Sequence, residues 1–235
     1  LKIPIVTNRG VNIPLNYFQS YKYRTGKVKK IIAVSHAVKD IMVKTGKIPP
    51  KKISVVYGSV DTGLFNPSVI STLRQELSIS ENLRIIGFAG NPHPRKGLEY
   101  LLKSFEIIKN KYDNVVLVLL GVSSLDMEKF NVEGKFKSRI FPLGFRKDVP
   151  NCMAAFDYFV FPGIQDEGLT GTLREAAAMG LPCITTDVAG NKELISNNVN
   201  GLVVPVKDPI KLAGAVSFLL ENPEKASIFG EKARE

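Results

Sequence analysis

Two short loops of this chain combine glycines with charged side chains, a composition typical of sites that bind anions or hydroxyl groups. The first spans residues 90–97 and reads Gly-Asn-Pro-His-Pro-Arg-Lys-Gly. Arg95 and Lys96 come just before a predicted helix, whose free backbone N–H groups and positive dipole end favour a bound anion. We therefore predict that this loop, including Gly90 and Asn91, cradles a diphosphate. The alternative is a basic loop that is only solvated.

The second loop contains Glu167 and leads into a predicted helix that carries Glu175 about one turn from its start. Between the two acids lie residues whose backbone N–H groups could face a phosphate: Gly168, Leu169, Thr170, Gly171 and Thr172. Carboxylates accept hydrogen bonds from sugar and ribose hydroxyls, so both acids are candidate binding residues. Two alternatives stay open. Thr172 and Glu175 have the spacing of a capping box, and Glu167 could be an exposed loop acid.

Strand-like and helix-like segments alternate along the chain, which predicts an α/β fold with a parallel sheet and helices on both faces. The clearer part has six short apolar strands, expected at residues 84–89, 115–120, 140–143, 158–161, 183–186 and 202–205. Helices are expected at residues 97–110, 148–155, 171–179 and 210–220. Such strands fit a doubly wound sheet, which binds ligands at the carboxyl ends of its strands. Both loops follow such ends, as does a third at residues 143–148 with Gly144 and Phe145.

The first part of the chain predicts a smaller set of the same elements. Strands are expected at residues 3–7, 31–35 and 53–57, and helices at residues 17–23 and 37–45. The turn residues Asp61-Thr62-Gly63 and Asn66-Pro67 follow, and they mark a predicted domain boundary. We therefore expect a small domain over residues 1–62 and a larger one over residues 63–235.

The net charge of +10 is concentrated at one end of the chain. Residues 1–60 hold 12 of the 32 Lys and Arg residues and one of the 22 Asp and Glu residues. Such a segment suits an anionic partner, such as a membrane surface or an acidic acceptor, although a solvated lysine-rich face is the alternative. No motif that reads nucleic acid accompanies it, and we predict no nucleic-acid binding. Cys152 and Cys183 form no Cys-x-x-Cys pair, and with two histidines they argue against a metal cluster.

The two acids also carry a specific resemblance. Seven residues separate Glu167 from Glu175 within Glu-Gly-Leu-Thr-Gly-Thr-Leu-Arg-Glu-Ala-Ala-Ala-Met-Gly-Leu-Pro, and Glu193-Leu-Ile follows downstream. This closely resembles the E-x7-E region of GT4, the retaining glycosyltransferases also called glycosyl transferases group 1. Residues 90–97 resemble the family's first phosphate loop, residues 144–149 its base-binding loop, and residues 31–35 and 57–65 the end of its N-terminal domain.

The family has the GT-B fold, in which two Rossmann-like domains face each other across a cleft. The resemblance implies that residues 63–235 are the C-terminal, donor-binding domain and residues 1–62 a remnant of the N-terminal, acceptor-side domain. It also implies that the chain ends before the family's final helix and that the usual active-site histidine lies upstream. We expect His36 and His93 to be incidental to ligand binding. A chain so shortened is expected to bind donor and to be inactive alone.

The resemblance assigns a role to each matching residue. Glu175 would bind the ribose hydroxyls of the donor nucleotide, and Glu167 the hydroxyls of the transferred sugar. Lys96 would neutralise the diphosphate leaving group, and backbone groups near Gly144 and Phe145 would hold the base. The family usually has Arg where this chain has Asn91. Our hypothesis is that Arg95 takes over part of that charge.

The implied reaction is transfer of a sugar, with retention, from a UDP- or GDP-sugar to a carbohydrate or lipid-linked acceptor. The expected product is a cell-envelope polysaccharide or glycolipid, made at the cytoplasmic face of a membrane that the basic residues 1–60 contact. The sequence has no Asp-x-Asp, the usual metal-binding motif of glycosyltransferases. We therefore predict a metal-independent enzyme without a cofactor, in which Lys96, Arg95 and helix N-termini stabilise the leaving group.

Three other classes of protein remain as alternatives. Another GT-B enzyme, such as a nucleotide-sugar epimerase or a phosphorylase, would share the fold. A non-catalytic nucleotide-sugar-binding protein would share the donor site, and Asn91 keeps that alternative open. A nicotinamide-dependent oxidoreductase is disfavoured because no G-x-G-x-x-G follows a predicted strand.

Overall fold

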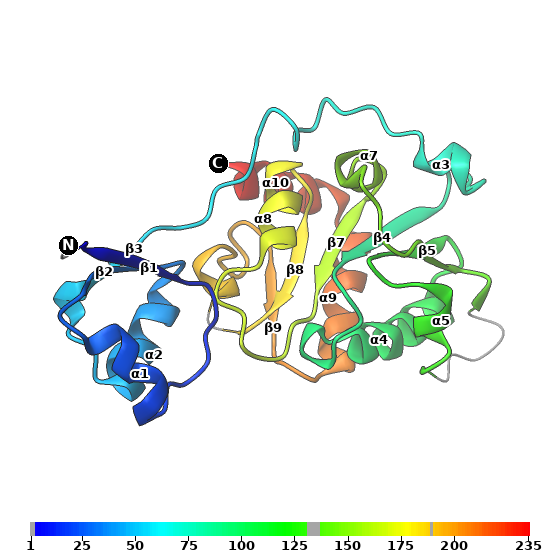
Figure 1. Cartoon of the computed structure of the whole chain (residues 1–235). Helices are drawn as coiled ribbons and strands as arrows, with labels where there is room; N and C mark the ends of the chain where they lie inside the picture. Colours follow the sequence, from blue (N-terminus) through cyan, green and yellow to red (C-terminus); the bar gives the residue numbers. More distant parts are fainter. Residues whose placement is uncertain (1–2, 131–136, 189) are drawn as a thin grey trace.

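The computed structural model describes residues 3–130, 137–188 and 190–235 of the chain. These residues form two parallel β-sheets flanked by helices (Figure 1). A three-stranded sheet has the order β1-β2-β3, and a six-stranded sheet has the order β6-β5-β4-β7-β8-β9. The predicted α/β fold with a doubly wound parallel sheet is therefore confirmed.

The small sheet forms from the first part of the chain. Its elements are β1 (Ile5–Arg9), α1 (Tyr17–Arg24), β2 (Val28–Ala33), α2 (His36–Gly46), the 3-10 turn η1 (Pro50–Lys52) and β3 (Ile53–Val55). Side-chain caps start both helices: Asn16 accepts a hydrogen bond from the Gln19 N–H, and Ser35 accepts one from the Val38 N–H. Ile31 and Met42 are fully buried between the sheet and α2.

The large sheet is buried on both faces. Its strands are β4 (Arg84–Ala89), β5 (Val115–Leu120), β6 (Ile140–Pro142), β7 (Tyr158–Phe161), β8 (Cys183–Thr186) and β9 (Leu202–Val204). The longer helices are α4 (Leu98–Lys111), α8 (Gly171–Ala178), α9 (Pro209–Glu221) and α10 (Pro223–Arg234). Short segments complete it: α3 (Leu73–Glu76), η2 (Pro94–Lys96), α5 (Ser124–Met127), α7 (Val149–Met153) and η3 (Asn191–Glu193). Every residue of β5, β7 and β8 is buried, which explains why these strands are apolar without alternation.

The strand order places a topological switch point between β4 and β7. The chain runs outward from β4 to β5 and β6, then returns to the other side of β4 and continues through β7, β8 and β9. Right-handed crossovers in opposite directions put α4 and α8 on opposite faces of the sheet. The loops that leave β4 and β7 therefore diverge and flank a crevice, where doubly wound sheets bind their ligands.

A long connection, residues 56–83, joins the two sheets and passes over the end of the large sheet (Figure 1). Two arginines of the large sheet's helices hold it. The Arg174 Nη1 donates to the Ser59 carbonyl at 2.7 Å, and the Arg234 Nη1 to the Phe65 carbonyl at 3.4 Å. The predicted boundary near residue 62 falls in this connection, and the division into two domains stays a prediction.

All nine expected strands are present, and the differences lie at their ends. The strand expected at residues 31–35 runs from Val28 to Ala33, because Ser35 serves as the cap of α2. The first strand is Ile5–Arg9, two residues later than expected. The helix expected from residue 97 begins at Leu98, since Gly97 adopts a left-handed conformation with φ 73°. The sequence pattern is weak over residues 124–135; this stretch contains α5, and its last five residues lie outside the described residues.

In the described part of the chain, none of the helices combines the length and the apolar character needed to cross a bilayer.

Candidate active site

The loops after β4 and β7 meet through a salt bridge. The Lys96 Nζ lies 2.8 Å from the Glu167 Oε1. The side chains are 27% and 13% exposed, so the pair is largely sheltered from solvent. The same ammonium lies 5.3 Å from the centre of the Phe161 ring, at the end of β7. The interpretation of Glu167 as an exposed loop acid is therefore wrong: the switch point brings it to Lys96 across 71 residues of sequence.

Glu175 lies in the second turn of α8, and its environment differs from that of Glu167. The helix is capped at Thr170, and the Thr172 hydroxyl donates to the Ala89 carbonyl at the end of β4 at 2.9 Å. The capping-box interpretation of Thr172 and Glu175 is therefore wrong, because Thr172 is already inside the helix. Burial raises the pKa of Glu175, and the neighbouring Arg174 partly opposes this shift. A half-buried carboxylate whose charge is only partly offset is suited to accept hydrogen bonds from ligand hydroxyls.

The predicted phosphate loop, residues 90–97, is held by its own hydrogen bonds and by a close approach to the next loop. His93 caps η2, since its Nδ1 accepts a hydrogen bond from the Arg95 N–H at 3.2 Å. Gly97 then lets the chain pass close to the next loop: a Cβ at this position would lie 1.9 Å from the Pro162 carbonyl oxygen. Asn91 accepts a long 3.4 Å bond from the His93 N–H. The loop thus ends in Arg95 and Lys96 immediately before the first turn of α4.

Arg95 points toward an acid that the sequence did not single out. Its Nη1 lies 3.5 Å from the Asp166 Oδ2, in a pair of which 39% and 23% of the side chains are exposed. Asp166 has a positive φ of 63°, which is unusual for a residue other than glycine. Backbone strain of this kind is common at functional sites. Arg95 is therefore within reach of the same crevice as Lys96.

The predicted base-binding loop lies beside the phosphate loop. Gly121 links them: its N–H donates to the Gly144 carbonyl at 2.7 Å, and a Cβ on it would lie 2.7 Å from the Gly90 carbonyl oxygen. The Gly144 N–H donates to the Val122 carbonyl at 2.7 Å. That donor is already used, which leaves Phe145, with a side chain 84% exposed, as the better candidate for contacts with a base.

The small sheet closes over the crevice. Val11 forms an antiparallel bridge with Glu167, and the Asn12 N–H donates to the Asp166 carbonyl at 3.3 Å. A cavity of about 150 Å³ remains beneath this contact. Its lining contains the predicted residues Asn91, Arg95, Lys96, Glu167, Gly168 and Leu169, together with Gly10, Val11, His93 and Asp166. Gly10 and Val11 follow the carboxyl end of β1, so the rule used for the large sheet could have found them.

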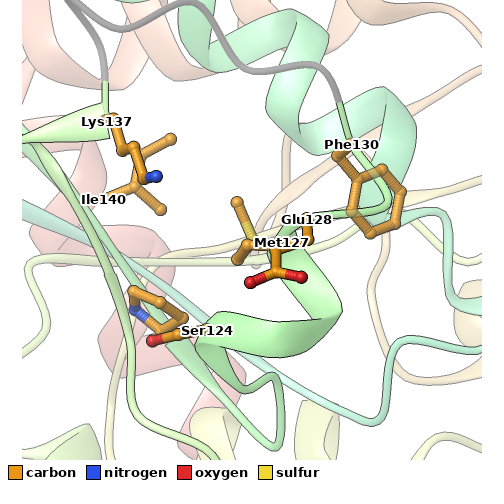
Figure 2. Close-up of a pocket in the computed structure, with 7 residues that line it drawn as sticks. Ser124, Met127, Glu128, Phe130, Lys137 and Ile140 are labelled. Carbon is orange, nitrogen blue, oxygen red and sulfur yellow. The ribbon is translucent and has the colours of Figure 1, made fainter.

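Larger cavities lie elsewhere. One of about 550 Å³ lies between α5 and β6 and is lined by Ser124, Met127, Glu128, Phe130, Lys137, Ile140 and Pro142 (Figure 2). None of these seven residues belongs to the predicted site, and the loops at the switch point do not contribute to this lining. Within residues 3–130, 137–188 and 190–235, no group of three or more His, Cys, Asp or Glu residues could hold a metal ion. Cys152 and Cys183 are both buried free thiols.

The fold is that of the GT-B glycosyltransferases, and solved structures of this class superpose on almost the whole chain. A glycosyltransferase from Rickettsia africae matches with a TM-score of 0.85 and 22% identity, over 97% of this chain and 64% of that one. The Anabaena protein Alr3699/HepE in complex with UDP matches with a TM-score of 0.85 and 23% identity, over 98% of this chain and 66% of that one. Likeness at this level of identity concerns the fold alone.

The family model described as "Glycosyl transferases group 1" matches residues 83–222, and the chain belongs to this family. A similar curated protein is the UDP-Gal:alpha-D-GlcNAc-diphosphoundecaprenol alpha-1,3-galactosyltransferase of Escherichia coli, 30% identical over 76% of this chain and 48% of its own length. The capsular polysaccharide biosynthesis glycosyltransferase CapM of Staphylococcus aureus is 26% identical over 99% of this chain and 64% of its own. The chain spans about half the length of most of the curated relatives it matches.

Proposed function

We propose that this chain is the donor-binding part of a retaining glycosyltransferase that moves a sugar from a UDP- or GDP-sugar to a carbohydrate or lipid-linked acceptor. The observation that carries the proposal is the Lys96–Glu167 pair at the switch point of a doubly wound sheet. A cation that can neutralise phosphate and a carboxylate that can bind hydroxyls stand side by side where such folds bind nucleotides.

In this proposal each group of the site acts on one part of the donor. Lys96 and the N-terminus of α4 stabilise the negative charge that develops on the leaving diphosphate, and Arg95 adds to that charge. Glu167 accepts hydrogen bonds from the sugar, Glu175 from the ribose, and the backbone at Phe145 contacts the base. Lys96 and Glu167 must then exchange their mutual salt bridge for contacts with the donor.

The proposed pathway follows the relatives. The Escherichia coli relative is named for a UDP-Gal donor and a diphosphoundecaprenol acceptor, and the Staphylococcus aureus relative for capsular polysaccharide biosynthesis. Cell-envelope polysaccharide or glycolipid synthesis at the cytoplasmic face of a membrane is the role we propose. Retention of the anomeric configuration is checked by NMR of the product of the whole enzyme.

Calorimetric titration of the 235-residue chain tests the donor site. UDP-glucose, UDP-galactose and GDP-mannose are compared with UDP and GDP, and we expect one base to be preferred. Lys96→Ala should weaken binding of the preferred nucleotide about tenfold or more, because a charge-assisted contact with phosphate is lost. Arg95→Ala should weaken it several-fold. Failure of all five compounds to bind would contradict the proposal.

Lys103→Ala is the matched control for these variants. Lys103 also follows the phosphate loop, but its side chain is 55% exposed and pairs with Glu99 on the outer face of α4. Its removal should leave nucleotide affinity unchanged. An equal loss of affinity in Lys96→Ala and Lys103→Ala would indicate a general effect of net charge and would argue against a specific role of Lys96.

A further inference from the structure

The backbone turn η3 lies behind the Glu167 loop. A Cβ on Gly190, which precedes η3, would lie 1.9 Å from the Gly168 carbonyl oxygen and 2.8 Å from the Glu167 carbonyl oxygen. Only glycine fits at position 190, because any side chain there would collide with the backbone of residues 167 and 168. The position of the Glu167 loop is therefore fixed by η3 at van der Waals distance.

A buried polar network continues this contact. Asn191, which is fully buried, donates from Nδ2 to the Thr185 hydroxyl at 2.9 Å, and that hydroxyl donates to the Phe161 carbonyl at 2.9 Å. The Thr170 hydroxyl lies 2.7 Å from the Asn191 Oδ1 and 3.3 Å from the Glu167 Oε2. The Thr170 hydroxyl has one proton, and its shorter hydrogen bond, to the Asn191 Oδ1, takes that proton. Asn191 therefore fixes the orientation of Thr170 and leaves the Glu167 Oε2 free to accept a hydrogen bond from a ligand.

The other end of η3 reaches the small sheet. Both carboxylate oxygens of Glu193 accept backbone hydrogen bonds at the start of α2, from the His36 N–H and the Ala37 N–H, each at 2.7 Å. The Tyr57 hydroxyl donates to the same carboxylate at 3.0 Å. A carboxylate at a helix N-terminus is held by the free N–H groups and by the helix dipole. Glu193 thus ties η3 to the other sheet.

We propose that η3 is a bracket that positions Glu167: Asn191 holds Thr170 beside the carboxylate and takes its hydroxyl proton, and Glu193 anchors the turn on α2. Asn191 and Glu193 are positioning residues, since neither touches the donor. The inference rests on the proposed function, in which Glu167 binds the transferred sugar. It predicts that substitutions in η3 reduce the gain in affinity that the sugar provides and leave the affinity for the free nucleotide unchanged.

The test compares a nucleotide sugar with its own nucleotide. The protein is titrated separately with UDP-glucose, UDP-galactose, GDP-mannose, UDP and GDP. For the wild type, the ratio of the affinity for a nucleotide sugar to that for its nucleotide gives the factor by which the sugar improves binding. In Asn191→Ser the Thr170 proton is released to the Glu167 Oε2, where it competes with the sugar hydroxyls. We expect that factor to fall about tenfold, with the affinity for UDP or GDP within about twofold of wild type. Glu193→Ala should reduce the same factor to a smaller extent, and Glu193→Gln should restore part of it.

The outcomes separate failure of the positioning role of η3 from failure of the proposed donor binding. If the wild type binds no nucleotide, the proposed function fails. If the wild type discriminates the sugar and Asn191→Ser discriminates it equally well, the positioning role of Asn191 is overturned. Equal discrimination in Glu193→Ala overturns the anchoring role of Glu193. Asn197→Ser is the folding control and should behave as wild type, because the Asn197 Oδ1 accepts a hydrogen bond from the Val203 N–H, which lies beyond η3.

Discussion

At the scale of single residues, the two acids of the site are prepared for different tasks. Glu167 forms a salt bridge with Lys96 at 2.8 Å, so its negative charge is neutralised by that ammonium. Glu175 is half-buried, and burial raises its pKa. Ionisation of the half-buried Glu175 therefore costs stability, which is typical of a residue retained for binding.

The raised pKa of Glu175 fixes the sign of a stability effect. Below the pKa of the unfolded chain the carboxyl is protonated in both states and contributes no pH dependence. As the pH rises from the pKa of the unfolded chain to the higher folded pKa, the unfolded state has already released its proton while the folded state retains it, so the free energy of unfolding decreases. We expect Glu175→Gln to raise the melting temperature at pH 7 and to weaken UDP or GDP binding about tenfold, measured by calorimetry.

Glu224→Gln is the control for that variant. Glu224 is exposed in the first turn of α10, far along the chain from the site, and its loss should change neither nucleotide affinity nor the pH dependence of melting. A lower melting temperature of Glu175→Gln at pH 7 would show that the ionised carboxylate stabilises the free protein, contrary to our interpretation.

The sequence was sufficient to place residues 90–97 and 167–175 at neighbouring strand ends, because the apolar pattern marks those ends. Their roles in donor binding stay predictions. The sequence was not sufficient for Asn191 and Glu193. Glu193 contacts His36 across 157 residues, and no local spacing announces a contact that exists only after both sheets have formed. Asp166 is intermediate: an acid before Glu167 was visible, but its positive φ and its pairing with Arg95 were not.

At the scale of elements, the site depends on loops that approach each other at glycines. Gly97 has φ 73°, and its missing side chain leaves room for the Pro162 carbonyl. Strand positions were predictable because buried parallel strands are continuous apolar runs. The start of α4 was not predictable from the sequence pattern, because it depends on the left-handed Gly97 and the turn η2. Both result from the close approach to the Pro162 carbonyl.

Gly97→Ala tests this requirement. The added methyl group collides with the Pro162 carbonyl and occupies an unfavourable backbone conformation, so we expect the free energy of unfolding to fall by about 2 kcal/mol or more. Urea denaturation measures it. Gly214→Ala, inside α9 with no atom within 4 Å of the new Cβ, should instead stabilise the protein by about 0.5–1 kcal/mol. Similar destabilisation by both would contradict the steric argument.

At the scale of the whole molecule, the site is shared by two sheets. The cavity of about 150 Å³ under residues 10–12 is smaller than the roughly 300–1,000 Å³ of ordinary ligand pockets. If the donor binds in this cavity as proposed, the small sheet's loop has to move away from Asp166 and Glu167. The small size of the cavity results from the contact between the two sheets. The sequence pattern within each half of the chain therefore could not predict it.

Hydrogen exchange detects that movement. The Asn12 N–H is held by the Asp166 carbonyl at 3.3 Å, and saturation with the preferred nucleotide sugar should accelerate its exchange. Amides of β5, buried in the large sheet, serve as the internal control and should keep their protection. Unchanged exchange at residues 10–12 under saturating donor would mean that the donor binds without opening the contact.

The basic residues 1–60 present an exposed aromatic surface that suits a membrane. On α1, the side chains of Tyr17, Phe18 and Tyr21 are 70%, 84% and 66% exposed, beside Lys22 and Arg24. Aromatic rings and cations together favour an anionic bilayer surface. We expect the chain to sediment with vesicles of phosphatidylglycerol and not of phosphatidylcholine, and Phe18→Ser to reduce that binding several-fold. Ile210→Ser, at a side chain 72% exposed in α9, is the control.

The long connection over residues 56–83 has a consequence for limited proteolysis. Leu64 and Ile70 are 54% and 91% exposed, whereas the contacts of Glu193 with α2 and of Val11 with Glu167 join the sheets elsewhere. A protease that cuts this segment would leave two fragments still associated through those contacts. The chain would then be nicked without being separated.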